Sequence, residues 1–205
     1  MHTNDTNKIN YFAADYEDKN RWMSYWHQIK EISNFHQGSV LIIGKGSGLV
    51  SEYLKLSGEK TITLDIDESL HPDVDASVLE MPFKDNEFDA VLCAQVLEHL
   101  PYEDFAKALS EIKRVANNGA VISLPHFGPA IRFLLKLPLV PEVKFMIKLP
   151  YPKKHIFKGE HYWEIGKRGF GMGKIKEDLK KSGFSIKNDY VVFENPLHHF
   201  FILKK

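Results

Sequence analysis

The chain has 205 residues, of which 43% are hydrophobic and 12% aromatic, a composition typical of a globular domain that excludes a disordered chain. Its 27 basic and 27 acidic residues balance, so bulk charge gives no reason to expect a nucleic-acid partner. A single cysteine, Cys93, excludes an intramolecular disulfide and a CxxC metal site. The N-terminal residues do not resemble a signal peptide, and prolines break the longest apolar region, so we expect a cytoplasmic protein without a transmembrane span.

The first expected element is an amphipathic helix from about residue 15 to residue 34. Trp22, Tyr25, Trp26 and Ile29 recur at the spacing of one helix face, so this helix should pack on a larger body. We therefore assign residues 1–37 to an N-terminal helical cap of a single domain.

Strands and helices alternate in the next part of the chain. The expected strands are 39–43, 60–65, 74–77, 88–93 and 120–124, and the expected helices are 47–56 and 102–116, with a turn at 117–119. Short apolar strands that alternate with amphipathic helices are typical of a doubly wound, parallel sheet in an α/β fold. A terminal unit at 173–205 should add a helix at 174–182 and an antiparallel hairpin at 184–193 and 198–203.

Residues 40–48 read V-L-I-I-G-K-G-S-G, with three alternate glycines directly after the first expected strand. This loop of a doubly wound fold lies at the sheet edge where ligands bind, and glycine lets a ligand approach the backbone. The spacing departs from the dinucleotide fingerprint G-x-G-x-x-G, and no Lys-Ser/Thr pair follows as in a P-loop. Asp65, at the end of the second expected strand, is placed to accept hydrogen bonds from ribose hydroxyls. Together the loop and Asp65 favour the binding of a nucleoside without a pyrophosphate. The alternatives are that the loop is a plain turn and that Asp65 is a solvated strand end.

Six segments, in order, resemble the class I S-adenosylmethionine-dependent methyltransferases and, among these, the type 11 domain group. They are V-L-I-I-G-K-G-S-G (40–48), T-L-D-I-D (63–67), D-A-S-V-L-E-M-P-F (75–83), D-N-E-F-D-A-V (85–91), V-L-E-H-L (96–100) and L-S-E-I-K-R-V-A-N-N-G-A-V-I-S (109–123). The resemblance covers about residues 38–125, the expected cofactor-binding half. It implies a Rossmann-like methyltransferase fold with a mostly parallel seven-stranded sheet and an antiparallel last strand. It also implies a methyltransferase that uses S-adenosylmethionine and releases S-adenosylhomocysteine.

The positions that match the family's motifs imply the cofactor contacts. The glycine loop would line the methionine and ribose side, Asp65 would hold the ribose, and Asp75 would accept from the adenine amino group. Asp75 also fits an Asx turn before Met81, so its role stays open. The full set implied by the resemblance is Gly44, Lys45, Gly46, Gly48, Asp65, Ile66, Asp75, Ala76, Ala94, Gln95 and Tyr11.

Two positions depart from the family's pattern. Ile42 stands where members usually carry an acid that orients the methionine amino group, and Lys45 places a cation near the expected sulfonium. Two functions therefore stay open: methyl transfer to a small or amphiphilic acceptor, and a non-catalytic cofactor-binding or regulatory module that keeps the fold. Glu98 and His99, after the fourth expected strand, fit either an active-site pair or a capping pair.

The long connection at 126–172 is assigned to a lid and acceptor insertion, because long loops without clear periodicity are usually functional. Between residues 127 and 158 seven basic residues accompany one acidic residue, Glu142, and apolar residues are interleaved with them. A basic, apolar lid would suit an amphiphilic acceptor or a weak contact with a membrane surface. The alternative is a cap helix with solvated lysines.

His126 and His161 are the candidates for a general base, because a histidine can take an acceptor's proton near neutral pH. No HxxxH or HxH spacing appears, so no metal site is predicted. Methylases of exocyclic base amines commonly carry N/D-P-P-Y/F after strand four, where residues 94–97 read A-Q-V-L, so a nucleic-acid substrate is not expected. The sequence does not determine the oligomeric state.

Overall fold

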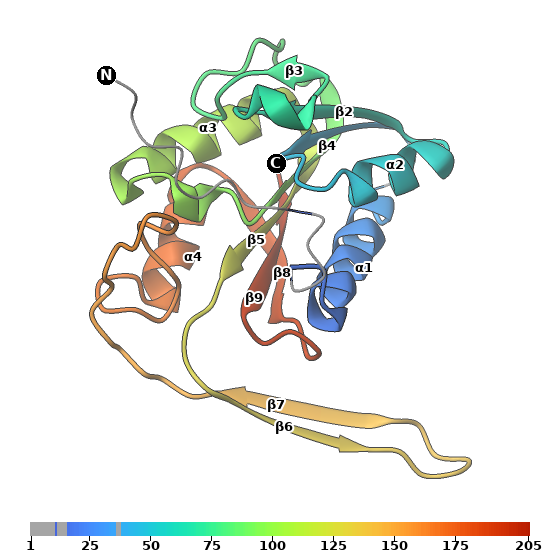
Figure 1. The fold of residues 1–205 in the computed structure, drawn as a ribbon, viewed down its shortest axis with the longest axis vertical. Helices are drawn as coiled ribbons and strands as arrows, with labels where there is room; N and C mark the ends of the chain where they lie inside the picture. The colour runs from blue at the N-terminus through green and yellow to red at the C-terminus, as the bar shows by residue number, and fades with distance from the viewer. Residues whose placement is uncertain (1–10, 12–15, 36–37) are drawn as a thin grey trace.

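The computed structural model describes residues 11, 16–35 and 38–205, and a seven-stranded sheet runs through its centre (Figure 1). The strands of this sheet are β1 (Ser39–Ile43), β2 (Lys60–Asp65), β3 (Val74–Asp75), β4 (Phe88–Ala94), β5 (Ala116–Pro125), β8 (Ser185–Val191) and β9 (His198–Lys204). The α-helices are α1 (Lys19–Ser33), α2 (Leu49–Leu56), α3 (Phe105–Val115) and α4 (Met172–Lys181), and 3-10 turns cover Glu68–Leu70, Leu97–His99 and Tyr102–Asp104.

The strand order is β3-β2-β1-β4-β5-β9-β8. Neighbouring strands from β3 to β5 pair in parallel, whereas β9 is antiparallel to both β5 and β8. The expected mostly parallel sheet with an antiparallel last strand is therefore confirmed. Its order reverses beside β1, so the loops after β1 and β4 open at the switch point where such sheets bind ligands.

Two apolar layers cover the sheet because successive residues of a strand point to opposite faces. Leu41 and Ile43 of β1 join the layer formed with α3 and α4, whereas Val40 and Ile42 join the layer formed with α1 and α2. Figure 1 shows these helix pairs on opposite sides of the sheet. Both layers are needed to bury strands that read as continuous apolar runs.

The helix boundaries follow from local capping. Helix α1 begins at Lys19, later than expected, because the Asp18 carboxylate accepts a hydrogen bond from the Arg21 amide at 2.8 Å. Helix α2 begins only after Gly48, whose φ of 79° is not helical.

The turn predicted at 117–119 is wrong, because α3 leads directly into β5. Gly119 pairs with Ala90 on β4 and with Lys204 on β9. A Cβ at Gly119 would lie 2.1 Å from the carbonyl oxygen of Leu203, so the glycine serves close strand packing rather than a turn.

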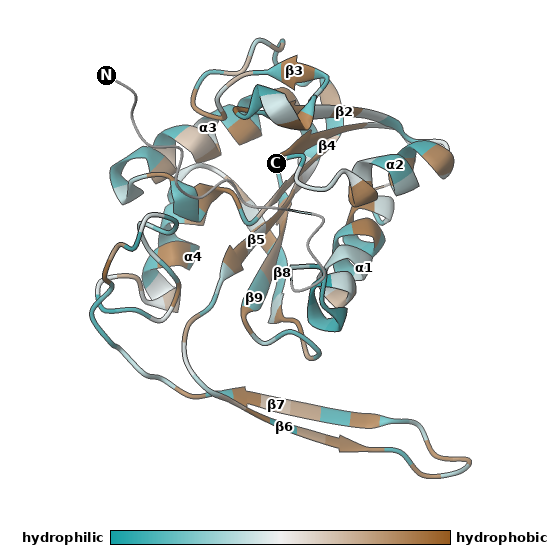
Figure 2. Ribbon diagram, viewed as in Figure 1, coloured by the Kyte–Doolittle hydropathy of each residue, from teal (hydrophilic) through white to brown (hydrophobic). Residues whose placement is uncertain are grey.

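Residues 126–172 contain a β-ribbon rather than the alternative cap helix. Strands β6 (Ala130–Leu135) and β7 (Val143–Lys148) form a separate two-stranded antiparallel sheet. Figure 1 shows this ribbon extending away from the seven-stranded body, and Figure 2 shows apolar residues along both strands. No helix in the described part of the chain is long and apolar enough to cross a membrane.

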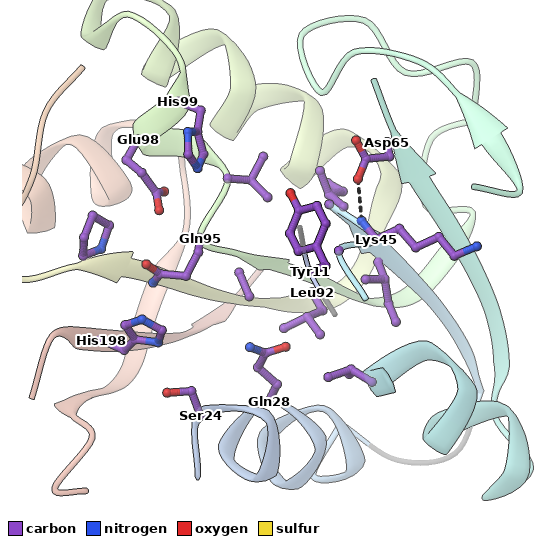
Figure 3. Close-up of a pocket in the computed structure, with 18 of the residues that line it drawn as sticks. Tyr11, Ser24, Gln28, Lys45, Asp65, Leu92, Gln95, Glu98, His99 and His198 are labelled. Atoms are coloured by element: carbon purple, nitrogen blue, oxygen red, sulfur yellow. Dashed lines mark hydrogen bonds between the residues drawn. The ribbon is translucent and has the colours of Figure 1, made fainter. Parts of the chain in front are cut away.

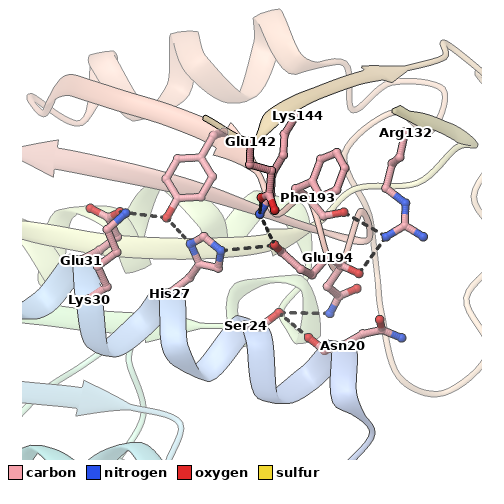
Figure 4. Close-up of polar contacts among 12 residues, drawn as sticks. Asn20, Ser24, His27, Lys30, Glu31, Arg132, Glu142, Lys144, Phe193 and Glu194 are labelled. Atoms are coloured by element: carbon pink, nitrogen blue, oxygen red, sulfur yellow. Dashed lines mark hydrogen bonds and ion pairs between the residues drawn. The ribbon is translucent and has the colours of Figure 1, made fainter. Parts of the chain in front are cut away.

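A polar network fixes the ribbon to the loop between β8 and β9 (Figure 4). Arg132 donates to the carbonyl oxygens of Phe193 and Glu194 at 3.0 Å each, and Lys144 Nζ lies 3.0 Å from Glu194 Oε1. His27 of α1 faces the same Glu194 carboxylate at 3.8 Å. The ribbon and α1 are therefore held by one carboxylate.

Candidate functional site

A cavity of about 970 Å³ lies at the carboxyl edge of β1, β2 and β4. Its walls come from the loop after β1, the ends of β2 and β4, helix α1, the start of the segment after β5, and residues 160–164. In Figure 3, Asp65 and Lys45 lie at one end of this pocket, and Glu98, His99 and His198 lie at the other. The residues of the ribbon do not line it.

The loop after β1 is shaped by glycines with positive φ. Gly44 and Gly46 have φ values of 83° and 53°, a region that residues with a Cβ rarely adopt. A Cβ at Gly44 would lie 2.4 Å from Val96 Cγ2. Both the conformation and the close approach to Val96 therefore require glycine at position 44.

Asp65 at the end of β2 closes this loop. Its Oδ2 accepts a hydrogen bond from the Lys45 amide at 2.7 Å, and its Oδ1 accepts from the Asp67 amide at 3.0 Å (Figure 3). The Lys45 side chain instead points outward, where its Nζ donates to the His71 carbonyl oxygen. The cation of Lys45 is thus turned away from the pocket, and Asp65 is more than a solvated strand end.

Most of the residues predicted to contact the cofactor line this one cavity. They are Tyr11, Gly44, Lys45, Gly46, Asp65, Ile66, Ala94 and Gln95. Gly48, Asp75 and Ala76 are not in its walls, where Ser77 and Val78 stand instead. Strand β3 ends at Asp75, two residues earlier than expected, and Asp75 pairs with Asp65 while the residues after the strand form the wall.

Ile42 is 4% exposed and belongs to the apolar layer under α1 and α2. Polar groups on this side of the pocket come instead from α1, where Ser24 and Gln28 line the wall and are buried (Figure 3). Sequence reasoning missed both, because the position of α1 on the sheet is a tertiary feature.

Glu98 is the most unusual polar group of the site. Its carboxyl is 0% exposed, burial raises its pKa to about 7, and its Oε2 has no hydrogen-bond partner. The Gln95 amide satisfies all its neighbours when its nitrogen faces Glu98 Oε1 at 3.2 Å and its oxygen faces the Leu124 amide at 3.3 Å. Glu98 and His99 both line the pocket.

His126 and His161, the two predicted bases, also line the cavity but have different partners. His161 Nδ1 lies 3.2 Å from Glu164 Oε1, and this hydrogen bond raises the pKa of His161. The backbone holds the segment in place, since the Tyr162 amide donates to the Glu98 carbonyl oxygen at 2.8 Å.

His126 heads a chain of polar side chains that leads to the surface. Its Nδ1 lies 3.1 Å from His199 Nδ1, and His199 Nε2 lies 3.1 Å from Asp189 Oδ1. If His199 donates to Asp189, its Nδ1 is an acceptor, so His126 donates from Nδ1 and keeps a lone pair on Nε2. Burial, His199 and Lys148 lower the pKa of His126 to about 3, so its ring is neutral near pH 7.

Comparison with known proteins finds similarity for the part of the chain that contains the glycine loop. The sequence profile of a methyltransferase domain matches residues 41–124. This segment is a methyltransferase domain. A relative from Methanocaldococcus jannaschii, described only as an uncharacterised protein, is 40% identical over 85 residues. That match covers 38% of this chain and 36% of the relative, so it spans about a third of the relative's length.

Solved structures show that the methyltransferase fold extends over most of the chain. A S-adenosylmethionine-dependent methyltransferase from Archaeoglobus fulgidus superposes with a TM-score of 0.62 and 17% identity, covering 90% of this chain and 94% of that chain. A 1,6-didemethyltoxoflavin-N1-methyltransferase from Burkholderia thailandensis has a TM-score of 0.60 and 16% identity, covering 90% and 80%. That structure contains 1,6-didemethyltoxoflavin and S-adenosylhomocysteine.

The protein should lose stability as the pH falls below about 6.5. Burial, followed by the nearby Arg21, lowers the pKa of His198 to about 4, whereas a histidine of the unfolded chain titrates near 6.5. The unfolded chain therefore binds a proton that the native protein does not, and stability is lost between about pH 6.5 and pH 4. Urea unfolding should show this loss, with about 2 kcal/mol from His198 between pH 7.5 and pH 5.

The variant His198→Gln should reduce that pH dependence, because glutamine does not titrate. The exposed His71 supplies the matched control, since His71→Asn should leave the pH dependence unchanged. If the free energy of unfolding of His198→Gln depends on pH as strongly as that of the wild-type protein, the assignment of a buried, neutral imidazole is contradicted.

Proposed function

We propose that the protein binds S-adenosylmethionine in this pocket and transfers its methyl group to a small or amphiphilic acceptor. The observation that carries the proposal is the convergence of the glycine loop and the Asp65 carboxylate on one cavity within the segment matched by the methyltransferase domain. The Burkholderia thailandensis enzyme, with its small-molecule ligand, supports an acceptor of this size.

The residues of the pocket fit an adenosyl cofactor. Gly44 and Gly46 leave the backbone open to close approach, and Asp65 keeps acceptor capacity for ribose hydroxyls beyond its two backbone hydrogen bonds. Ile66 is 81% exposed at the rim, where it would cover one face of an adenine ring. Ser77 lines the wall where Asp75 was expected, so we assign the adenine edge to the segment after β3 as a whole.

Helix α1 would bind the methionine end in place of the missing acid at Ile42. The Gln28 amide can accept from an ammonium group, and Arg21, also in the wall, carries a charge that suits a carboxylate. Arg21 is held by its hydrogen bonds to the Tyr16 carbonyl oxygen at 2.8 Å and the Tyr16 hydroxyl at 3.1 Å. Tyr11 lines the same cavity and would close over the cofactor.

The cofactor supplies an activated methyl group, so the protein's main contribution is to align the acceptor with it. Where the acceptor must lose a proton, His126 Nε2 would take it. His126 Nδ1 then donates to His199 Nδ1, and His199 Nε2 donates to the Asp189 carboxylate, whose negative charge offsets the charge of the protonated imidazole. Lys176, 2.8 Å from Asp189 Oδ2, stabilises the carboxylate at the end of this chain.

Titration calorimetry with S-adenosylmethionine and S-adenosylhomocysteine tests the first step on the intact chain. We expect one site per chain, and no binding at millimolar ligand would refute the proposal. A screen of a metabolite extract for transfer of a labelled methyl group tests the second step. Binding without transfer to any extract component would favour the non-catalytic module instead.

We also propose that the ribbon of β6 and β7 contacts an anionic membrane surface. Its apolar side chains remain exposed on both strands, as Phe133 at 53% and Phe145 at 55% illustrate. Arg132, Lys144 and Lys148 hold the ribbon to the body, whereas no hydrogen bond or ion pair within the described ranges engages the Lys136 side chain. An apolar surface with a cation near its tip suits insertion among anionic headgroups.

Leu139 at the ribbon tip offers a sharp test of this contact. It is fully exposed and has a φ of 63°, a conformation that costs a leucine energy and that asparagine tolerates. Leu139→Asn should therefore leave the free energy of unfolding unchanged or slightly higher, yet reduce co-sedimentation with anionic vesicles several-fold. Leu56→Asn is the control, because Leu56 is 87% exposed on α2, away from the ribbon. If wild-type protein fails to sediment with anionic vesicles at low salt, the membrane contact is refuted.

A further inference from the structure

We propose that Glu98, His99 and His161 bind one divalent transition-metal ion, of the zinc class, at the end of the pocket away from Asp65. One carboxylate oxygen and one nitrogen of each imidazole lie within 4.8 Å of one another. His99 and His161 are 62 positions apart, so sequence spacing gives no sign of the group, and the fold alone assembles it. Binding of the ion is independent of the proposed methyl transfer.

The free atoms of the three side chains are the ones that a metal needs. His161 Nδ1 is engaged by Glu164 Oε1 at 3.2 Å, and His99 Nδ1 by the Glu160 carbonyl oxygen at 3.1 Å. Each ring therefore has Nε2 left for a ligand. Metal-binding histidines almost always donate their other N–H to a carboxylate or a backbone carbonyl in this way.

Glu98 supplies the second, independent indication of a ligand. It is 0% exposed, and its Oε2 has no hydrogen-bond partner although it lines the cavity. The Gln95 amide holds the other oxygen, Oε1, at 3.2 Å. A buried carboxylate oxygen without a partner is costly, and a metal ion would satisfy it.

The rigid surroundings keep the three side chains together. Glu98 and His99 lie on the 3-10 turn Leu97–His99 directly after β4, and the Tyr162 amide joins the neighbouring segment to the Glu98 carbonyl oxygen at 2.8 Å. Atoms that share a tetrahedral zinc ion lie about 3.4 Å apart, given metal–ligand distances of about 2.0–2.2 Å. Side-chain movements of about 1 Å would therefore bring the three ligand atoms close enough to share one ion.

The donor set identifies the kind of ion and its use. Two imidazoles and one carboxylate favour zinc, iron, cobalt or nickel over magnesium, and three protein ligands leave positions open to the pocket. An oxygen of the acceptor would occupy an open position, and the ion would orient it and lower the pKa of a bound hydroxyl. This role in acceptor binding rests on the proposed function, whereas the metal site does not.

Titration calorimetry of the untagged, metal-stripped protein with zinc, cobalt(II) and magnesium chlorides tests the site. We expect one zinc or cobalt ion per chain, no comparable magnesium binding, and a visible absorption spectrum for bound cobalt. Glu98→Gln and His161→Gln should each weaken zinc binding more than ~100-fold, beyond the ~10–100-fold effect of losing an outer partner. Glu164→Gln should fall within that smaller range.

Two further variants keep the test decisive. His126→Gln removes a histidine of the same pocket outside the group, so zinc binding should be unchanged. His99→Ala alters an exposed side chain, so loss of the ion there cannot be due to unfolding. The proposal is overturned if zinc and cobalt show no saturable site, if the ligand variants bind as wild type does, or if magnesium binds more tightly than zinc. Each outcome is read without S-adenosylmethionine, so failure of the metal site and failure of the proposed function are distinguishable.

Discussion

Asp65→Ala should weaken the binding of S-adenosylmethionine by about 10- to 100-fold, because a hydrogen bond to a charged group contributes ~1.5–3 kcal/mol. The substitution has two effects on the site. It removes the acceptor proposed for the ribose, and it leaves the amides of Lys45 and Asp67 without their 2.7 Å and 3.0 Å partners. The second effect loosens the glycine loop itself. Titration calorimetry on the purified variant measures the change.

Asp75→Ala is the matched control for this prediction. Asp75 is the other acid that the family resemblance implies, it lies on the neighbouring strand, and it does not line the cavity. We expect its substitution to change the dissociation constant less than about threefold. Equal losses in both variants would show that Asp75 contacts the adenine edge, as the family resemblance implies.

Trp163→Ala should lower the free energy of unfolding by about 3–5 kcal/mol, the range typical of truncating a buried aromatic side chain. Trp163 is 0% exposed, and its ring packs against Tyr102 and Phe105 with centroids 4.9 Å and 5.0 Å away. Its indole nitrogen donates to the Leu100 carbonyl oxygen at 3.1 Å. Truncation therefore leaves a large cavity and an unpaired carbonyl. Urea denaturation measures the loss.

Trp22 on α1 provides the comparison, because its side chain is 52% exposed. Trp22→Ala should change stability by less than about 1 kcal/mol. Trp163→Phe should lie between the two, since it keeps an aromatic ring but not the hydrogen bond to Leu100. A loss in Trp163→Ala no larger than that in Trp22→Ala would show that residues 160–166 do not depend on this anchor.

Trp163 also holds neighbouring residues of the pocket in position. His161 and Glu164 flank it in the chain, and both line the cavity. An anchored indole thus fixes the segment that brings His161 to Glu98. We expect zinc binding to weaken in Trp163→Phe less than in His161→Gln, because the ring still fills most of the space.

The sheet and its glycine loop could be read from the sequence because their signals are local. The run of residues 40–43 is long enough and apolar enough for a buried strand, and the glycines at 44, 46 and 48 directly follow it. Asp65 could be placed because it ends the next apolar strand, and parallel strands end at the same edge of a sheet. These inferences needed only periodicity and spacing.

Other features depended on strand register and on contacts that spacing does not encode. Asp75 was expected in the cofactor pocket, but it pairs with Asp65 at the end of a short β3, and Ser77 lies in the wall instead. The turn expected at Gly119 is part of β5, because that glycine admits the Leu203 carbonyl oxygen of β9. The ribbon of β6 and β7 shows no helix-like periodicity. Its apolar residues are exposed on both faces, so the sequence lacks the alternation of apolar and polar residues that marks a half-buried strand.

The sequence by itself determined the fold class and the glycine-loop end of the pocket, since both follow from short-range patterns of apolar residues, glycines and one acid. Only the tertiary structure decided how the other side chains are placed around the pocket. It turned Lys45 outward to the His71 carbonyl, placed Gln28 of α1 in the wall of the cavity that Ile42 also lines, and brought His161 to Glu98 across 63 positions of chain. The physical reason is that these contacts are long-range: each depends on how a helix or loop packs over the sheet edge, and no local spacing records that packing.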